Sequence, residues 1–298
     1  EKLESFLFNY FCKKYFLITP TDIFTISSQK QFEKIALKVF RFQHENNPVY
    51  HDFCNHLKVD KQKVKSLQQI PFLPIQFFKS HNVLSSTDSI QETFSSSGTT
   101  GMTTSKHHVT DITLYEESYR KGFADFYGNI EDYVILALLP SYLERDGSSL
   151  IYMVDDLIKL SNNPESGFYL NQYDTLSQKL TELDNSGQNV ILIGVTYALL
   201  DLVEQYNFSL KNTIIMETGG MKGKRKEMIR EELHQLLCDG FGVENIHSEY
   251  GMTELLSQAY SLGNGVFECP SWMQILVRDT EDALTYIDDG KTGGINVI

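Results

Sequence analysis

The chain has 298 residues, of which 26 are Lys or Arg and 39 are Asp or Glu, so its formal charge is −13 at pH 7. This acidic balance argues against nucleic acid or an anionic membrane as the main partner. A hydrophobic content of 41% is typical of a globular protein, and the length allows one large domain or two smaller ones. No apolar run is long enough to predict a membrane span, and no secretory signal pattern opens the chain.

The cysteines and histidines do not favour a metal site. The cysteines are scattered without metal-ligand spacing, at Cys12, Cys54, Cys238 and Cys269. This usage fits a reduced, cytoplasmic setting. Three N-terminal histidines are spaced so that they do not share one helical face, which leaves zinc as the less favoured interpretation: His44, His51 and His56.

Residues 1–70 are predicted to be helical. Ser27 and Ser28 could cap a helix whose apolar face comprises Phe32, Ile35, Ala36, Val39 and Phe40. A further helix is predicted from Pro48 to His56. The many aromatic side chains of this region are expected to form core, with a ligand-binding aromatic box as the alternative. The segment Ile70–Lys79 is predicted to be a connector into the main sheet, because its two prolines restrict the backbone and the residues before them to extended forms.

Strands and helices alternate in the rest of the chain. Strands are predicted at 91–94, 133–139, 189–194, 213–217, a segment ending at Tyr250, and 295–298. Continuous apolar runs followed by helical patterns indicate a mostly parallel sheet with both faces covered. Ligands bind such sheets at the carboxyl ends of the strands. The loops after Gly194, Glu217 and Tyr250 are therefore candidate site segments.

Two of the intervening helices have predicted buried faces. Thr110 or Asp111 could cap the first, which would bury Leu114, Tyr115, Ser118 and Phe123. The second follows the segment 218–227, and its apolar residues are expected on one side of the helix: Met228, Ile229, Leu233, Leu236 and Leu237.

The segment Ser95–Lys106 has the composition of a phosphate-binding loop. Glycines let the backbone turn sharply and approach a ligand, and successive N–H groups in such a turn can bind anions. Ser and Thr hydroxyls add donors, and Lys106 adds a positive charge. The spacing of Gly98 and Gly101 differs from that of a Walker A loop. A Ser/Gly linker is the alternative interpretation.

Two further segments carry candidate site residues. Gly219 and Gly220 would let the backbone approach a flat or anionic ligand. The basic run after them is read as a solvated face, with a phosphate clamp as the alternative: Lys222, Lys224, Arg225 and Lys226. In His247–Glu254, Tyr250 can stack on a purine, Thr253 can reach a phosphate oxygen, and the Glu254 carboxylate can hold Mg²⁺.

These motifs, in this order and separation, resemble those of the adenylate-forming superfamily. Ser96–Gly101 is similar to its phosphate loop, Glu249–Glu254 to its adenine, phosphate and magnesium motif, and Gly219–Gly220 to its adenine-side turn. Within the superfamily, Ile70–Lys79, Ser105–His107 and Glu217–Gly223 resemble the acyl-protein synthetase (LuxE) branch. Phenylacetate-CoA ligases are the nearer relatives outside that branch.

The resemblance implies an α/β fold of mixed, mostly parallel sheets flanked by helices. Residues 1–70 would be a helical part packed on the main domain, and 71–298 an adenylation core. The family's small C-terminal domain, its catalytic Lys and its ribose-binding Asp would lie beyond residue 298. In the LuxE-like branch the acylated Cys would lie there as well.

The resemblance also implies roles for individual residues. Catalytic roles would fall to Lys106, Thr253 and Glu254, of which Glu254 would hold the metal. Residues 194–197 resemble the wall of the family's acyl pocket: Gly194, Val195, Thr196 and Tyr197. ATP would be bound by Ser96, Ser97, Gly98, Thr99, Thr100, Gly101, Gly219, Gly220, Glu249, Tyr250, Gly251, Met252 and Thr253.

The implied activity is that of an AMP-forming ligase that uses ATP and Mg²⁺. A carboxylate, here a fatty acid, would give an acyl-adenylate, from which a protein cysteine would take the acyl group. An acyl reductase or transferase is a possible partner. Two alternatives stay open at this point: an acyl- or aryl-CoA ligase with the same first step, and a non-catalytic nucleotide-binding scaffold.

Overall fold

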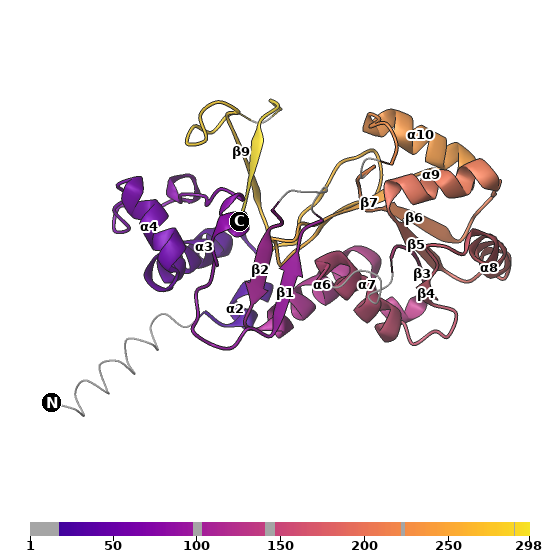
Figure 1. Cartoon of the computed structure of the whole chain (residues 1–298), viewed down its shortest axis with the longest axis horizontal. Helices are drawn as coiled ribbons and strands as arrows, with labels where there is room; N and C mark the ends of the chain where they lie inside the picture. The colour runs from indigo at the N-terminus through magenta and orange to yellow at the C-terminus, as the bar shows by residue number, and fades with distance from the viewer. Residues whose placement is uncertain (1–17, 98–102, 141–146, 222–223, 289) are drawn as a thin grey trace. The chain divides into compact units, whose positions relative to one another are not determined.

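The computed structural model describes residues 18–97, 103–140, 147–221, 224–288 and 290–298 (Figure 1). The chain forms two compact units. The first comprises Glu1–Thr93, Thr99–Leu114 and Cys269–Ile298, and the second comprises Phe94–Gly98 and Tyr115–Glu268. The predicted boundary near residue 70 stays a prediction.

Helices dominate the N-terminal part of the first unit: α2 (Pro20–Phe24), α3 (Gln29–Asn46), α4 (Pro48–His56) and the 3₁₀ turn η1 (Leu67–Gln69). The Ser28 hydroxyl accepts a hydrogen bond from the Gln31 N–H and so caps α3, as predicted. Residues 1–17 lie outside the described part of the chain.

The core of this unit joins the two ends of the sequence. The α3 side chains of Phe32, Ala36 and Phe40 are buried, as the helical spacing predicted. Trp272, from the C-terminal segment, meets Phe24 edge to face with ring centroids 5.1 Å apart. The antiparallel pair β9 (Ile275–Arg278) and β10 (Gly294–Val297) belongs to the same unit. No local sequence pattern predicts this long-range grouping.

The connector after η1 is only partly extended. Residues 71–74 lack regular structure, as expected, but the chain then turns into the short helix α5 (Phe77–Ser80). The Phe77 N–H donates to the Pro74 carbonyl at 3.0 Å, so the turn starts at the second proline. The helical turn after Pro74 is compatible with the prediction, because proline restricts itself and the residue before it more than those after it. The prediction that the connector leads into the main sheet is wrong, because the next strand, at residues 92–95, belongs to a separate two-stranded sheet.

The second unit is built on a six-stranded sheet with the order β4-β3-β5-β6-β7-β8. All neighbouring strands are parallel except β7 and β8, which confirms the predicted α/β class. The strands are β3 (Val134–Leu138), β4 (Gly167–Phe168), β5 (Val190–Gly194), β6 (Thr213–Glu217), β7 (His247–Tyr250) and β8 (Ala259–Ser261). A separate two-stranded sheet is formed by β1 (Glu92–Ser95) and β2 (Lys106–Val109).

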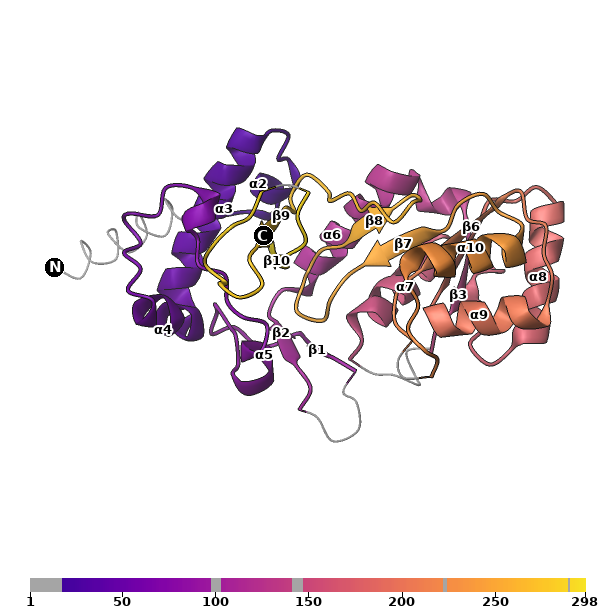
Figure 2. The same ribbon diagram turned by 90° about the horizontal axis from the view of Figure 1, so that it is seen from above.

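Helices cover both faces of the large sheet. They are α6 (Ile112–Tyr127), α7 (Ser149–Leu160), α8 (Tyr173–Asn185), α9 (Thr196–Gln205) and α10 (Arg230–Phe241), with the 3₁₀ turn η2 (Ile130–Asp132) after α6. In Figure 1, α6 and α7 lie on one face and α9 and α10 on the other. Figure 2 shows α9 and α10 side by side. Among the described residues, no helix has the length and apolar character needed to span a bilayer.

The predicted helix faces agree with the structure for α6 and only in part for α10. Tyr115, Ser118 and Phe123 are buried on α6, and Leu114 is half-buried. Two residues of the apolar face predicted for α10 are exposed. Ile229 is 68% exposed because it precedes the helix in an extended conformation, and Leu236, within the helix, is 44% exposed. The pattern continued through a loop into the helix, so spacing alone misplaced the helix start.

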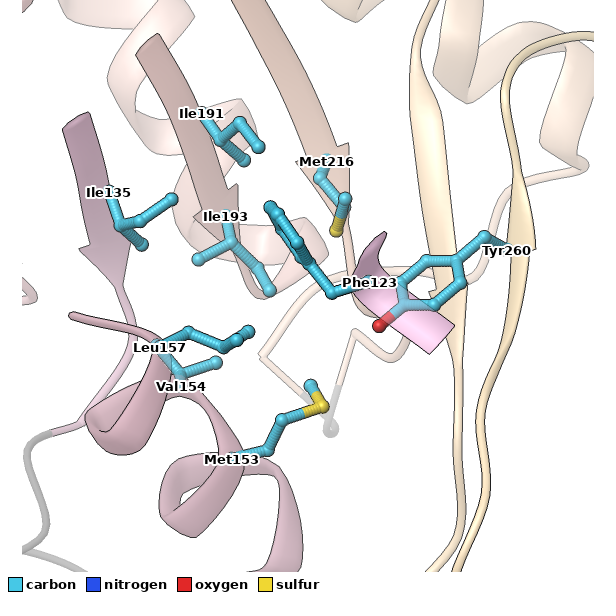
Figure 3. A pocket seen from close by; sticks show the side chains of 9 residues that line it. All are labelled: Phe123, Ile135, Met153, Val154, Leu157, Ile191, Ile193, Met216 and Tyr260. Carbon is cyan, nitrogen blue, oxygen red and sulfur yellow. The ribbon is translucent and has the colours of Figure 1, made fainter. Parts of the chain in front are cut away.

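The core between the sheet and helices α6 and α7 holds one small cavity among the described residues, of about 10 Å³ (Figure 3). Its lining is apolar, and the hydroxyl of one lining residue, Tyr260, has no hydrogen-bond partner among the described residues. This volume suits about one water molecule. A ligand of the size of an acyl group or a nucleotide must therefore bind elsewhere.

The packing of α9 on α10 gives a test of the fold. A Cβ atom added at Gly240 would overlap the Val203 side chain. We expect Gly240→Ala to lower the free energy of unfolding by about 1–3 kcal/mol, as overpacking does. Gln235→Ala, at an exposed position of the same helix, should change it by no more than about 0.5 kcal/mol. Urea unfolding measures both, and equal stabilities would contradict the helix contact.

Candidate functional site

Three predicted site segments follow neighbouring parallel strands and so meet at one edge of the sheet. Gly194 at the end of β5 pairs with Glu217 at the end of β6, and Glu217 pairs with Ser248 in β7. The Thr218 N–H donates to the Gly194 carbonyl at 3.0 Å, which ties two of the following loops together. The three candidate loops, after Gly194, Glu217 and Tyr250, leave the sheet at the same edge as a consequence of this register.

The segment predicted as an acyl-pocket wall leads directly into α9. A Cβ atom at Gly194 would lie 2.8 Å from the Leu199 side chain, so only glycine allows this close approach of helix and strand. Val195, Thr196 and Tyr197 are all buried. The Lys224 ammonium lies 4.7 Å from the centroid of the Tyr197 ring, in a cation–π contact.

The predicted adenine-side turn has a backbone that only glycine adopts easily. Gly219 and Gly220 have φ values of 76° and 87°, in the left-handed region where side chains are disfavoured. Apart from its two chain neighbours, no described residue has an atom within 4 Å of the position that a Cβ on Gly219 would occupy. The turn therefore presents an open backbone surface that a flat group could approach.

A buried carboxylate, Glu217, holds this turn in place. Its Oε2 accepts hydrogen bonds from the Gly219 N–H at 2.6 Å and from the Thr196 hydroxyl at 3.3 Å. Its Oε1 accepts from Arg230 Nη1 at 2.7 Å, and the same nitrogen donates to the Ser248 hydroxyl at 3.0 Å. The Glu217 side chain thus joins the loops that follow β5 and β6 to strand β7.

The charge of Glu217 is stabilised by its neighbours. Burial by itself would raise the pKa of this carboxyl group. The His234 imidazole, whose Nε2 lies 3.7 Å away, together with Ser248, Arg230 and the Gly219 N–H, outweighs burial and lowers the pKa to about 2. Glu217 is therefore ionised at neutral pH.

The sequence motifs predict the loop after Glu217 as a site segment and assign no site role to Glu217 itself. The one available signal was a charged residue that ends an otherwise apolar, buried strand and precedes a glycine pair. Its partners Arg230 and Ser248 lie far along the chain, in α10 and β7, so their contribution depends on tertiary packing.

The segment predicted to bind adenine, phosphate and metal forms a tight turn after β7. The Leu255 N–H donates to the Met252 carbonyl at 3.0 Å, which places Thr253 and Glu254 at the two central positions of the turn. The half-buried Tyr250 donates its hydroxyl to Met252 Sδ at 3.1 Å. Gly251 is exposed, and Thr253 and Glu254 are partly exposed, so the turn is accessible.

Glu249, the first residue of this motif, points away from solvent. Its side chain is 7% exposed, and it pairs across the antiparallel ladder with Tyr260. Burial, with a further contribution from the negative charge of Glu217, raises the pKa of Glu249 to about 8. The Glu249 carboxyl is therefore largely protonated at neutral pH, and its predicted role in ATP binding stays a prediction.

The predicted phosphate loop is described only at its ends. Ser96 and Ser97 follow β1, while Gly98, Thr99, Thr100 and Gly101 lie outside the described residues. Lys106 begins β2 in the first compact unit and is exposed. Its role as a phosphate ligand stays a prediction.

The basic run is partly neutralised by acidic side chains of α9. Arg225 Nε donates to Asp201 at 3.0 Å, and its Nη1 donates to Glu204 at 2.6 Å. Lys226 is exposed, and Lys222 lies outside the described residues. These ion pairs favour the solvated-face interpretation of the run over a phosphate clamp.

None of the three described cysteines is suited to nucleophilic chemistry at neutral pH. Burial raises the pKa of the thiols of Cys54, Cys238 and Cys269, and Asp239 raises that of Cys238 further. A thiol attacks as the thiolate, which a raised pKa disfavours. The remaining cysteine, Cys12, lies outside the described residues.

Comparison with known proteins supports the resemblance seen in the motifs. Residues 15–128 match the sequence model of the LuxE acyl-protein synthetase family. The chain is 25% identical over 249 residues to the long-chain-fatty-acid–luciferin-component ligase of Vibrio harveyi, an alignment that covers 77% of the chain. It spans 64% of the length of that relative. The chain is thus similar to LuxE-type acyl-protein synthetases, in agreement with the resemblance of the motifs.

Solved structures of similar fold come from the adenylate-forming superfamily. A 2-hydroxyisobutyryl-CoA ligase in the postadenylation state, in complex with 2-HIB-AMP, matches with a TM-score of 0.65 and 12% identity over 93% of this chain and 61% of its own. An open conformation of the same kind of ligase, with 2-HIB-AMP and CoA, gives a TM-score of 0.62 and 12% identity over 91% and 66% of the two chains. At this identity the likeness concerns the fold, which confirms the predicted class.

The buried Glu249 makes the stability of the fold depend on pH. Its pKa rises from an ordinary value of 4.5 to about 8 on folding. Between these values the folded protein holds a proton that the unfolded chain has lost, so stability decreases as pH rises, by up to about 1.4 kcal/mol per pH unit. Glutamine mimics the protonated acid and cannot titrate. We therefore expect the stability of Glu249→Gln relative to wild type to increase steadily from pH 5 to pH 8.

Urea unfolding at several pH values measures this effect. Glu244→Gln is the matched control, because Glu244 is exposed and lies just before β7. The control should follow the wild-type curve. A Glu249→Gln curve that also runs parallel to wild type would contradict a neutral, buried Glu249.

Proposed function

We propose that this protein uses ATP to activate a fatty acid as acyl-AMP and then transfers the acyl group to a protein thiol. The observation that carries the proposal is the meeting of three predicted site segments at one sheet edge: 194–197, 218–220 and 250–254. Parallel α/β sheets bind their ligands at this edge. The similarity to a long-chain-fatty-acid ligase of Vibrio harveyi supports a fatty acid as the substrate.

In the first step a carboxylate oxygen attacks the α-phosphorus of ATP, and the bond to the bridging oxygen breaks to release pyrophosphate. The protein does little covalent work in such a step; it positions the reactants and stabilises negative charge. In the proposal, Gly219 and Gly220 approach the adenine and Tyr250 flanks it. Thr253 contacts the α-phosphate, and residues 96–101 with Lys106 hold the other phosphates.

We assign the Mg²⁺ ion to Glu254. Magnesium is usually held in proteins by one or two carboxylates together with substrate phosphates. Glu254 suits this role because it is a partly exposed carboxylate in a turn beside the proposed phosphate ligand Thr253. The described residues contain no cluster of His, Cys, Asp or Glu that could hold a metal by itself. Phosphate oxygens would supply the other ligands.

In the second step the thiolate sulfur attacks the acyl carbon, and AMP leaves with the bonding electrons. The acceptor distinguishes the proposal from a CoA ligase. A CoA ligase needs a site for the 3′-phosphate, and Arg225 of the basic run is already paired with Asp201 and Glu204. This favours a protein acceptor. We place the reaction in the cytoplasm, with an acyl reductase or transferase as the partner that uses the product.

The first test concerns the metal. Glu254→Gln should reduce carboxylate-dependent ATP–pyrophosphate exchange by at least about 100-fold, because the ion that offsets the phosphate charge loses its protein ligand. Glu244→Gln, at an exposed position before β7, should retain wild-type exchange. Circular dichroism verifies that both variants fold. Wild-type exchange in Glu254→Gln would remove Glu254 from the site.

The second test concerns the acceptor. Full-length protein, ATP and a radiolabelled long-chain fatty acid should yield protein that carries a hydroxylamine-sensitive label, since hydroxylamine cleaves thioesters. Addition of CoA should not divert the label. Quantitative release of acyl-CoA without labelled protein would instead establish a CoA ligase. Absence of any ATP–pyrophosphate exchange with a panel of carboxylic acids would favour the non-catalytic scaffold.

A further inference from the structure

We propose that Glu217 is a positioning residue that sets the geometry of the ATP site without touching the substrate. This inference rests on the proposed function. The structure places Glu217 at the end of β6, directly before the Gly219–Gly220 turn, with a side chain that is 2% exposed. It is too deeply buried to be a direct ligand of ATP, but it accepts hydrogen bonds from Thr196 and Gly219, which belong to two proposed site segments, and from Arg230 of α10.

The two carboxylate oxygens have separate tasks. Oε2 fixes the Gly219 N–H at 2.6 Å and the Thr196 hydroxyl at 3.3 Å, so it sets the spacing between the adenine-side turn and the acyl-pocket segment. Oε1 accepts a hydrogen bond from the Arg230 guanidinium at 2.7 Å. Through Arg230 the carboxylate also reaches Ser248, two residues before Tyr250 in β7.

The turn needs this support because little else defines it. Both of its glycines have left-handed backbone angles, and glycine has the largest conformational freedom to lose. Among the described residues other than its chain neighbours, none lies within 4 Å of where a Cβ on Gly219 would point. The hydrogen bond to Glu217 Oε2 therefore orients the peptide that would contact the adenine.

A neutral replacement would separate the roles of shape and charge. Glutamine at position 217 has nearly the same volume and can still accept from Gly219, but it leaves Arg230 without its counter-ion. We expect Arg230 and the turn to shift, which lowers ATP affinity in the ground state and the transition state alike. Loss of such uniform binding raises KM and leaves kcat nearly unchanged.

The test measures ATP–pyrophosphate exchange on the full-length protein at several ATP concentrations. Glu217→Gln should raise the KM for ATP by about ten-fold with kcat within about two-fold, the size expected for one charge-assisted hydrogen bond. Arg230→Gln should likewise raise the KM for ATP and leave kcat nearly unchanged. It serves as the second variant because the Arg230 side chain is 40% exposed and its loss is easier for the fold to accommodate.

Asp156→Asn is the matched control. Asp156 pairs with Arg120 at 2.8 Å between α7 and α6, and neither residue belongs to a proposed site segment. A purely structural role for Glu217 predicts that Glu217→Gln and Asp156→Asn both lower stability and both leave the KM for ATP unchanged. The positioning role predicts that only Glu217→Gln and Arg230→Gln alter it.

The outcomes separate this inference from the proposed function. Exchange by the wild-type protein with an unchanged KM in both Glu217→Gln and Arg230→Gln would overturn the positioning role alone. Absence of exchange in the wild-type protein would overturn the proposed function and this inference with it. A fall in kcat without a rise in KM would also overturn the inference, because it would mean that Glu217 acts in the chemical step.

Discussion

The candidate site depends on the parallel pairing of β5, β6 and β7. Parallel pairing places the carboxyl ends of all three strands at one edge, so the loops that leave them are neighbours although they are distant in sequence. Strand β5 is apolar and buried, and β6 is mostly apolar up to its last residue, Glu217. Strand β7 is polar, so the chemistry-bearing side chains come from the loops, the end of β6 and β7 itself.

Two buried carboxyl groups on adjacent strands carry opposite protonation states. Glu217 in β6 meets a guanidinium and two hydrogen-bond donors and is ionised. Glu249 in β7 pairs with Tyr260 of β8, and the charge of Glu217 adds to the effect of burial in keeping it protonated. One carboxylate thus organises the site edge while its neighbour behaves as a neutral core group.

Local patterns were enough to predict the elements that are defined by local interactions. The strand predicted at 189–194 is observed as β5 over Val190–Gly194, and the helix predicted from Pro48 to His56 is α4 with the same bounds. The patterns could not reveal the contact of Arg230 with Glu217 or the packing of Trp272 on Phe24, because these contacts require the tertiary fold. The start of α10 was misplaced since the apolar residues before it happen to continue the helical spacing.

The thiol in the second step of the proposed reaction imposes a chemical condition on the acceptor. A nucleophilic cysteine needs a substantial thiolate fraction at neutral pH. Burial raises the pKa of the thiols of Cys54, Cys238 and Cys269 and so lowers their thiolate fraction. The acceptor must then be a thiol other than these three, in a more polar or more positively charged setting. An electropositive neighbour is the feature to seek at that cysteine, because a nearby cation is what stabilises a thiolate.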